Sequence, residues 1–178
     1  MTDRGASLTT RQIAEAAGVA EGTLFRVFPD KRALCLAAAE HALRPPHWRE
    51  DLAAAMAAQP ALHGKVVDVA GRMQERMRQV MAVMMALRTA MMDDPGHRHT
   101  PGEPPGPPAF FADAARELLE ALADLVFAPH ADELRVAPDV AALALRNLVM
   151  GGVGPGSESS PRLTPDQVAD LLLTGVRA

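Results

Sequence analysis

The sequence has no tyrosine, one tryptophan and five phenylalanines, so aromatic residues make up only 3% of the chain. Strands favour aromatic and β-branched side chains, whereas alanine, leucine and methionine favour helices. Hydrophobic residues nevertheless make up 48% of the sequence. The core must therefore come from alanine, leucine, valine and methionine, and this composition predicts an all-α fold.

Cysteine and long apolar runs are also scarce. Cys35 is the only cysteine, which excludes an internal disulfide framework and fits a reducing compartment. The sequence has no run of about 18 apolar residues and no charged-then-apolar leader. We therefore expect a cytoplasmic protein with neither a membrane span nor a signal peptide.

Charge is moderate and slightly negative. Charged residues make up 22% of the 178 residues, and the net charge is −4. These values are typical of a soluble globular protein and exclude wholesale disorder. The negative balance argues against a protein that coats nucleic acid over its whole surface, but it leaves room for a local basic site.

Prolines and glycines divide the chain into a series of expected helices. The first follows Thr9 and Thr10 and ends at Gly18, and Asp30 is expected to cap the third. The expected helices after Gly18 cover residues 21–25, 31–43, 47–59, 64–92, 109–128, 138–151 and 165–176, with loops at 93–108 and 151–161.

The most informative stretch runs from Thr9 to Leu34. Two short helices are joined there by a turn containing a glycine, which is the pattern of a helix-turn-helix. The residues expected to pack its corner are Ile13, Ala14, Ala17, Val19 and Leu24.

Residues Thr10 to Lys31 closely resemble the DNA-binding region of TetR-family (tetracycline-repressor-like) transcriptional regulators. The matching landmarks are Ile13-Ala14, Ala17-Gly18-Val19, Gly22-Thr23-Leu24, and Phe28 followed three residues later by Lys31. The resemblance implies a DNA-binding domain over residues 1–44. It also implies a ligand-binding and dimerisation domain over residues 45–178, whose helices fit the family in number and order.

The resemblance implies a set of residues that contact double-stranded operator DNA. A recognition helix presents its first side chains to base edges, while flanking groups hold phosphates. The implied contacts are Thr10, Arg11, Glu21, Gly22, Thr23, Phe25, Arg26 and Lys31. Alternatively, Thr10 is only a helix cap and Arg11 only a solvated charge. Glu21 would repel phosphate unless it accepts a hydrogen bond from cytosine.

The sequence departs from the family in three ways. Ala20 and Phe25 stand where the family usually has serine and tyrosine, and both changes remove a hydroxyl that could cap the helix or bind phosphate. Family members also carry a further helix before this motif, and residues 1–5 align only with its end. We therefore expect weakened DNA binding, and either a natural start upstream of Met1 or the omission of the preceding residues from this sequence.

Methionine is concentrated in one expected helix, because seven of the ten methionines fall between Met73 and Met92. Flexible methionine side chains suit a pocket for a small hydrophobic effector. The candidate lining residues are Met77, Met81, Met84, Met85, Trp48, Phe110 and Phe111. The alternative is that the methionine stripe is ordinary core.

The last two expected helices, 138–151 and 165–176, carry apolar faces. In the family the corresponding helices form a four-helix interface in a homodimer, and a palindromic operator needs such a two-fold axis. The alternative is that these faces close the core of the monomer.

Catalysis finds little support in the sequence. Cys35 has no histidine at a telling spacing, and no phosphate-binding glycine loop or zinc-type cysteine spacing occurs. Asp93, Asp94, His97 and His99 could hold a metal, but such groups at helix ends are mostly solvated. We expect no catalytic residue, no metal and no cofactor.

The sequence thus predicts a ligand-responsive, homodimeric transcriptional regulator that acts as a repressor. Two alternatives remain: a dimeric ligand-binding protein of the same fold that no longer binds DNA, and a small helical enzyme.

Overall fold

The computed structural model describes residues 11, 14–15, 18–92, 109–151 and 162–176. All regular elements in these ranges are helical, and none is a strand, which confirms the all-α fold class. The chain forms two compact units: Met1–Leu43 with Arg78–Pro107, and Arg44–Met77 with Pro108–Ala178. The expected loop at 93–108 lies outside the described residues, and so does the expected loop at 151–161 after Gly151, which is a turn.

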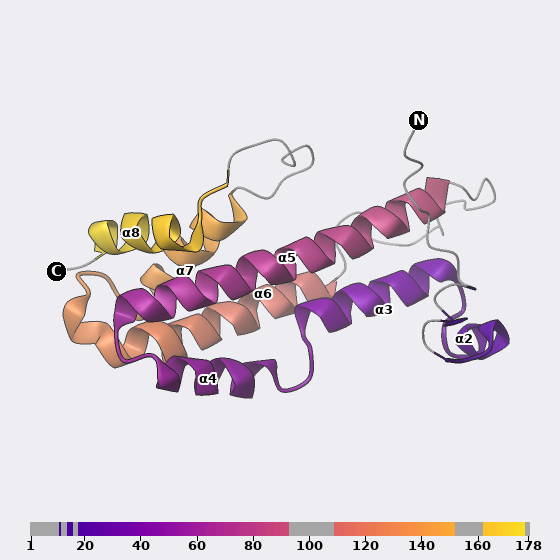
Figure 1. Ribbon diagram of the computed structural model, residues 1–178, viewed down its shortest axis with the longest axis horizontal. Coiled ribbons are helices and arrows are strands. Elements are labelled where there is room, and N and C mark those ends of the chain that lie inside the picture. The colour runs from indigo at the N-terminus through magenta and orange to yellow at the C-terminus, as the bar shows by residue number, and fades with distance from the viewer. Residues whose placement is uncertain (1–10, 12–13, 16–17, 93–108, 152–161, 177–178) are drawn as a thin grey trace. The chain divides into compact units, whose positions relative to one another are not determined.

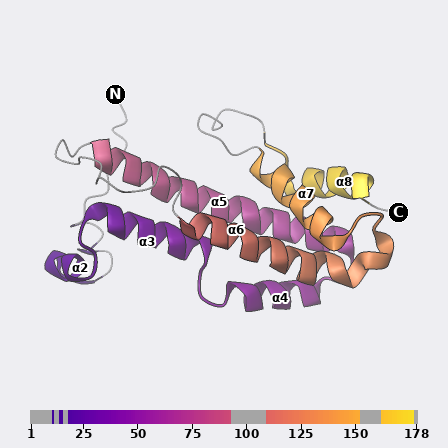
Figure 2. The same ribbon diagram turned by 180° about the vertical axis from the view of Figure 1, so that it is seen from behind.

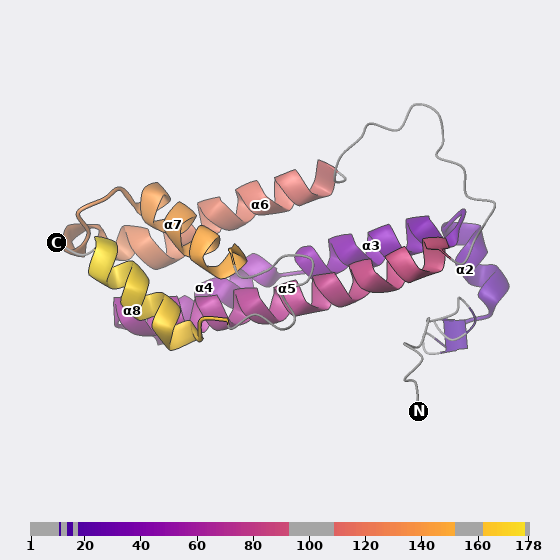
Figure 3. The ribbon, with the colours of Figure 1, turned by 90° about the horizontal axis from the view of Figure 1, so that it is seen from above.

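The first unit contains α2 (Glu21–Val27), α3 (Lys31–Leu43) and the second part of α5 (Leu62–Met92). Within it, α3 and the last turns of α5 run side by side (Figures 1 and 3). Pro29 and Asp30 separate α2 from α3, and Asp30 caps α3 as expected, because its Oδ1 accepts a hydrogen bond from the backbone N–H of Ala33 at 2.7 Å.

The second unit is built from the first part of α5 and four further helices. These helices are α4 (Trp48–Ala58), α6 (Ala109–Leu122), α7 (Pro138–Met150) and α8 (Pro165–Val176). Seen from above, α7 lies between α6 and α5 (Figure 3), and it packs against both α6 and α8. The same helices are seen from the front and from behind in Figures 1 and 2. From above, α8 crosses the first turns of α5 (Figure 3).

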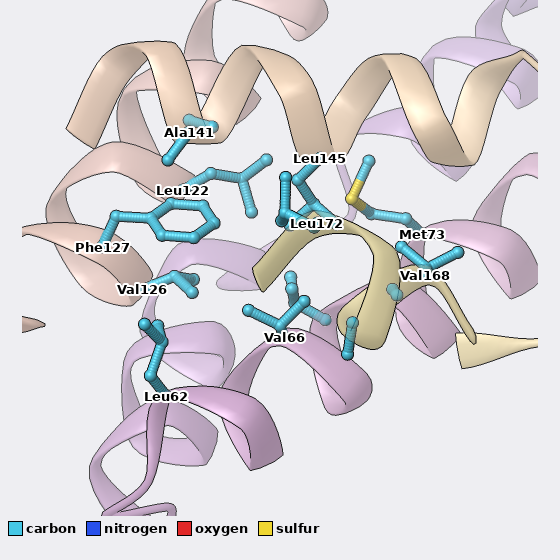
Figure 4. Close-up of a cluster of buried hydrophobic side chains, with 14 of the residues drawn as sticks. Leu62, Val66, Met73, Leu122, Val126, Phe127, Ala141, Leu145, Val168 and Leu172 are labelled. Carbon is cyan, nitrogen blue, oxygen red and sulfur yellow. The ribbon is translucent and has the colours of Figure 1, made fainter. Parts of the chain in front are cut away.

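The core of the second unit is aliphatic with a single large ring, that of Phe127 (Figure 4). Leu62, Val66 and Met73 reach it from α5, and Leu145 and Leu172 reach it from α7 and α8. Met73 therefore belongs to the ordinary core, as do Val66 and Val69 of the same helix.

One expected helix is shorter than predicted. The sequence pattern suggested a continuous helix over 109–128, but α6 ends at Leu122. A π-helical turn, η1 (Ala123–Phe127), and a 3₁₀ segment, η2 (Ala128–Glu133), follow it. The reason is Pro129, whose ring would clash with the carbonyl of Leu125 in an α-helix. The wider turn lets the N–H of Ala128 reach the carbonyl of Ala123, and it turns both Val126 and Phe127 into the core.

The last helix, α8, is fixed at both ends. Thr164 Oγ1 accepts a hydrogen bond from the N–H of Gln167 (3.2 Å), and Gln167 Oε1 accepts one from the N–H of Thr164 (2.9 Å). This reciprocal pair is a capping box. At the other end, Arg135 donates to the carbonyls of Thr174 and Gly175, each at 2.9 Å, so it satisfies carbonyls that the helix leaves free.

Candidate DNA-binding site

The turn that precedes α2 depends on a glycine, as the sequence predicted. Gly18 has φ = +68°, a left-handed conformation that side chains rarely adopt. Its N–H donates to the carbonyl of Glu15 (3.1 Å), and the N–H of Val19 donates to the carbonyl of Ala14 (3.0 Å). These bonds end the preceding helix and redirect the chain into α2. Ala14 is buried there as expected, whereas Val19 is exposed and does not pack the corner.

The start of α2 carries no side-chain cap. Ala20 is extended (φ −71°, ψ 143°) and occupies the capping position, where its methyl group has no acceptor to offer. The first turn is held by the backbone instead, because the N–H of Thr23 donates to the carbonyl of Ala20 at 2.8 Å. The absence of a serine hydroxyl at this position therefore removes a cap, which typically contributes about 1 kcal/mol to helix stability.

The side chains of α2 divide into an outward and an inward set. Thr23, Phe25 and Arg26 are exposed, and so is Gly22, where an added Cβ would meet nothing within 4 Å. Leu24 and Phe28 are half-buried and form the inward side. Four of the predicted DNA contacts therefore stand open on one short helix.

Glu21 differs from these neighbours. It is half-buried and makes an interaction within the chain. A half-buried side chain is less available to meet DNA than the exposed Thr23 and Arg26 that follow it.

The flanking phosphate contacts are only partly within the described residues. Arg11 is exposed and forms an ion pair with Glu15, one helical turn away, at 3.0 Å. An exposed pair of this spacing is worth only about 0.3–0.5 kcal/mol, so the guanidinium can exchange it for a phosphate. Lys31 is the first residue of α3, but its side chain lies outside the described residues, as does Thr10.

Among the predicted effector-site residues, Trp48 is the best defined. It is half-buried, packs against the core of the second unit, and lies under the guanidinium of Arg76, 5.8 Å from the ring centroid. Burial and the nearby charge of Arg72 lower the pKa of Arg76, in that order. No local sequence pattern predicts this cation–π pair, because its two residues lie on different helices.

The remaining candidates fall into separate groups. Phe110 and Phe111 stack on each other at the start of α6, with ring centroids 4.5 Å apart. Met77 is half-buried in the second unit, whereas Met81 and the more exposed Met85 belong to the first. Met84 belongs to α5, but its side chain lies outside the described residues.

A second contact missed by sequence reasoning follows the end of α3. Arg44, the next residue after this helix, donates from Nη2 to Oε1 of Glu117 on α6 at 2.7 Å, and both side chains are partly buried. Arg44 is therefore held on α6, the helix that carries Phe110 and Phe111 in its first turn.

The apolar faces of α7 and α8 are divided between core and surface. Val168, Leu172 and Val176 are buried in the chain's own core, while Val140, Leu143 and Leu171 are exposed. The alternative that these faces close the core of the monomer thus holds for the first set, while the second set lies at the surface of the chain.

No group of three or more histidine, cysteine, aspartate or glutamate residues in the described ranges could hold a metal. The candidates Asp93, Asp94, His97 and His99 lie outside those ranges, as does the side chain of Cys35. Within the same ranges, no helix combines the length and apolar character that crossing a membrane requires.

Comparison with known proteins gives one match. Residues 1–38 match the family model described as bacterial regulatory proteins, tetR family. No curated protein and no solved structure matches the chain. The matched segment contains the Gly18 turn, all of α2 and the start of α3, which is the region whose exposed side chains were described above. Over this segment the chain is therefore similar to the bacterial regulatory proteins of the tetR family.

Proposed function

We propose that the chain is a DNA-binding transcriptional regulator of the tetR family, a homodimeric, cytoplasmic repressor that binds a palindromic operator and releases it when a small hydrophobic effector binds. The observation that carries the proposal is the solvent-exposed face of α2. Gly22, Thr23 and Arg26 are all exposed there, and a Cβ added at Gly22 would meet nothing within 4 Å. Thr23 can meet a phosphate or a thymine methyl group, and Arg26 can meet guanine or phosphate.

A dimer would place two copies of α2 on successive major grooves. A two-fold symmetric protein reads half-sites about 34–36 Å apart, or a multiple of that spacing. The exposed residues Val140, Leu143 and Leu171 support α7 and α8 as the face that joins the two copies.

The effector would act through α3. The contact between Arg44 and Glu117 supports this route, because Arg44 directly follows α3 in the sequence and Glu117 lies on the helix that carries Phe110 and Phe111. An effector weakens DNA binding only as far as it prefers the released state. A coupling of about 1–3 kcal/mol would lower operator affinity roughly 5–150-fold.

The first test is fluorescence anisotropy on the DNA adjacent to the gene, across a salt series, with the chain and with Lys31→Ala. Removing one phosphate contact should weaken binding to all sequences and reduce the salt slope by about one. Arg116→Gln is the matched control, because it removes one exposed positive charge from α6 and leaves the helix-turn-helix region unchanged. Unchanged affinity and slope for Lys31→Ala would remove Lys31 from the interface, and absence of salt-dependent binding by the unaltered chain would overturn the repressor proposal.

The second test concerns the effector. Trp48 is the only tryptophan, so intrinsic fluorescence reports on this residue alone. We expect a hydrophobic effector to change this signal and to release the operator over the same concentration range. Release without a change at Trp48 would place the effector elsewhere, and a bound compound that leaves operator affinity unchanged would favour the alternative of a ligand-binding protein without DNA control.

A further inference from the structure

The last residue of α2 is an unusually exposed apolar side chain. Val27 exposes 69% of its surface, more than any other large hydrophobic residue in the described ranges. It was not among the residues that the sequence assigned to DNA binding. A single exposed valine is common on protein surfaces, so its meaning depends on what surrounds it on the helix.

The geometry of the helix groups Val27 with the predicted contact residues. Successive residues of an α-helix are rotated by about 100°, so Val27 lies only about 40° around the axis from Thr23. Arg26 lies about 60° to the other side of Thr23. The half-buried Leu24 lies about 100° from Thr23 on the same side as Val27, so Val27 stands between Thr23 and the inward side of α2. Its 69% exposure nevertheless groups Val27 with the exposed Thr23 beside it, toward the carboxyl end of the helix.

The chemistry of the side chain limits what it can meet in a major groove. Valine has no donor or acceptor, so it cannot hold a phosphate or a polar base edge. Thymine, however, presents an apolar C5-methyl group in the major groove, and the other three bases lack it.

We propose that Val27 is a specificity-determining residue that reads the C5-methyl group of a thymine at the edge of each half-site. The inference rests on the proposed operator binding and adds a base preference to it. Thr23 and Arg26 supply polar contacts, and Val27 adds an apolar contact beside them. Loss of one buried methyl contact should lower affinity about fourfold for each thymine read.

The test starts by selecting operators from a random duplex library with the unaltered chain. Each conserved thymine of the selected operator is then replaced in turn by deoxyuridine, which pairs identically but lacks the methyl group. The affinities of the chain and of Val27→Ala are measured on both duplexes. We expect one thymine per half-site at which the chain loses about fourfold and Val27→Ala loses nothing, because the methyl has already lost its partner.

Val19→Ala is the matched control. It removes the same two methyl groups from another exposed valine that precedes α2, and it should keep the full response to deoxyuridine. Thermal unfolding of Val27→Ala should match that of the unaltered chain. A lowered midpoint would instead indicate that Val27 packs against the protein, and this would overturn the inference.

The outcomes separate the inference from the proposed function. If an operator is selected but Val27→Ala responds to deoxyuridine as the unaltered chain does, Val27 does not read thymine and only the inference fails. If no sequence is enriched by the unaltered chain, operator binding fails and the inference fails with it.

Discussion

Leu143 and Leu145 lie two residues apart on α7 and differ in what surrounds them. Leu145 is fully buried in the core of the second unit, whereas Leu143 is 44% exposed. Leu145→Ala should lower the free energy of unfolding by about 2–5 kcal/mol, because it removes packed methyl groups and leaves a cavity. Urea unfolding at low protein concentration measures this loss.

Leu143→Ala is the control for that measurement, since it makes the same change on the same helix. At a surface position the free energy of unfolding should change by no more than about 0.5 kcal/mol. Equal losses for the two variants would contradict the described packing of α7.

Single residues also mark the limit of what the sequence could predict. The roles of Gly18 and Asp30 were predicted and confirmed, because a left-handed turn and a helix cap involve neighbours within a few residues. The contact from Arg44 to Glu117 spans 73 residues, and the bond from Arg135 to Gly175 spans 40. Such pairs depend on how the helices pack against one another, so no local sequence pattern predicts them.

At the scale of a helix, the capping box of α8 gives a sharp expectation. Thr164→Ala removes the acceptor for the N–H of Gln167 and should cost about 1 kcal/mol of stability. Thr174→Ala is the control on the same helix. Its hydroxyl donates only to the carbonyl of Asp170, which does not cap the helix start.

Thermal and urea unfolding of both variants measure the difference. A loss for Thr174→Ala as large as that for Thr164→Ala would mean that the hydroxyl at the helix start has no special role. The helix α8 carries buried residues on one side and the exposed Leu171 on the other. Fraying of its first turn should therefore weaken the packing of the buried side and increase the mobility of the exposed side.

Helix boundaries were predictable where proline, glycine or a cap sets them. The expected helices over 31–43 and 165–176 agree with α3 and α8. The expected helix over 109–128 was wrong at its end, because the apolar pattern continues through Leu125, Val126 and Phe127. The ring of Pro129 clashes with the carbonyl of Leu125, four residues earlier. Its effect therefore begins before residue 128, where the sequence pattern predicts the end of the helix.

For the whole molecule, the unresolved question at the sequence level was whether the last two helices close the core or join two copies. Buried Val168 and Leu172 face the core of the chain, while Leu143 and Leu171 are left at the surface. A self-complementary apolar face on these helices is what a two-fold dimer requires. The sequence could not separate the two sets, because both follow the same helical period.

Replacing Leu143 and Leu171 together by glutamate therefore tests the dimer. Both positions are exposed, so the single chain should still fold. In a two-fold interface both protomers carry the two substitutions, so each glutamate occurs twice. Burying unpaired carboxylates there would make the free energy of dimerisation less favourable by several kcal/mol. We expect the mass in sedimentation to fall from twice 18.9 kDa to 18.9 kDa, and operator binding to weaken because each monomer reads only one half-site. Ala112→Glu, on the exposed side of α6, should keep the dimer. If the double variant keeps twice the mass, α7 and α8 do not form the interface, and their exposed apolar face must meet another partner.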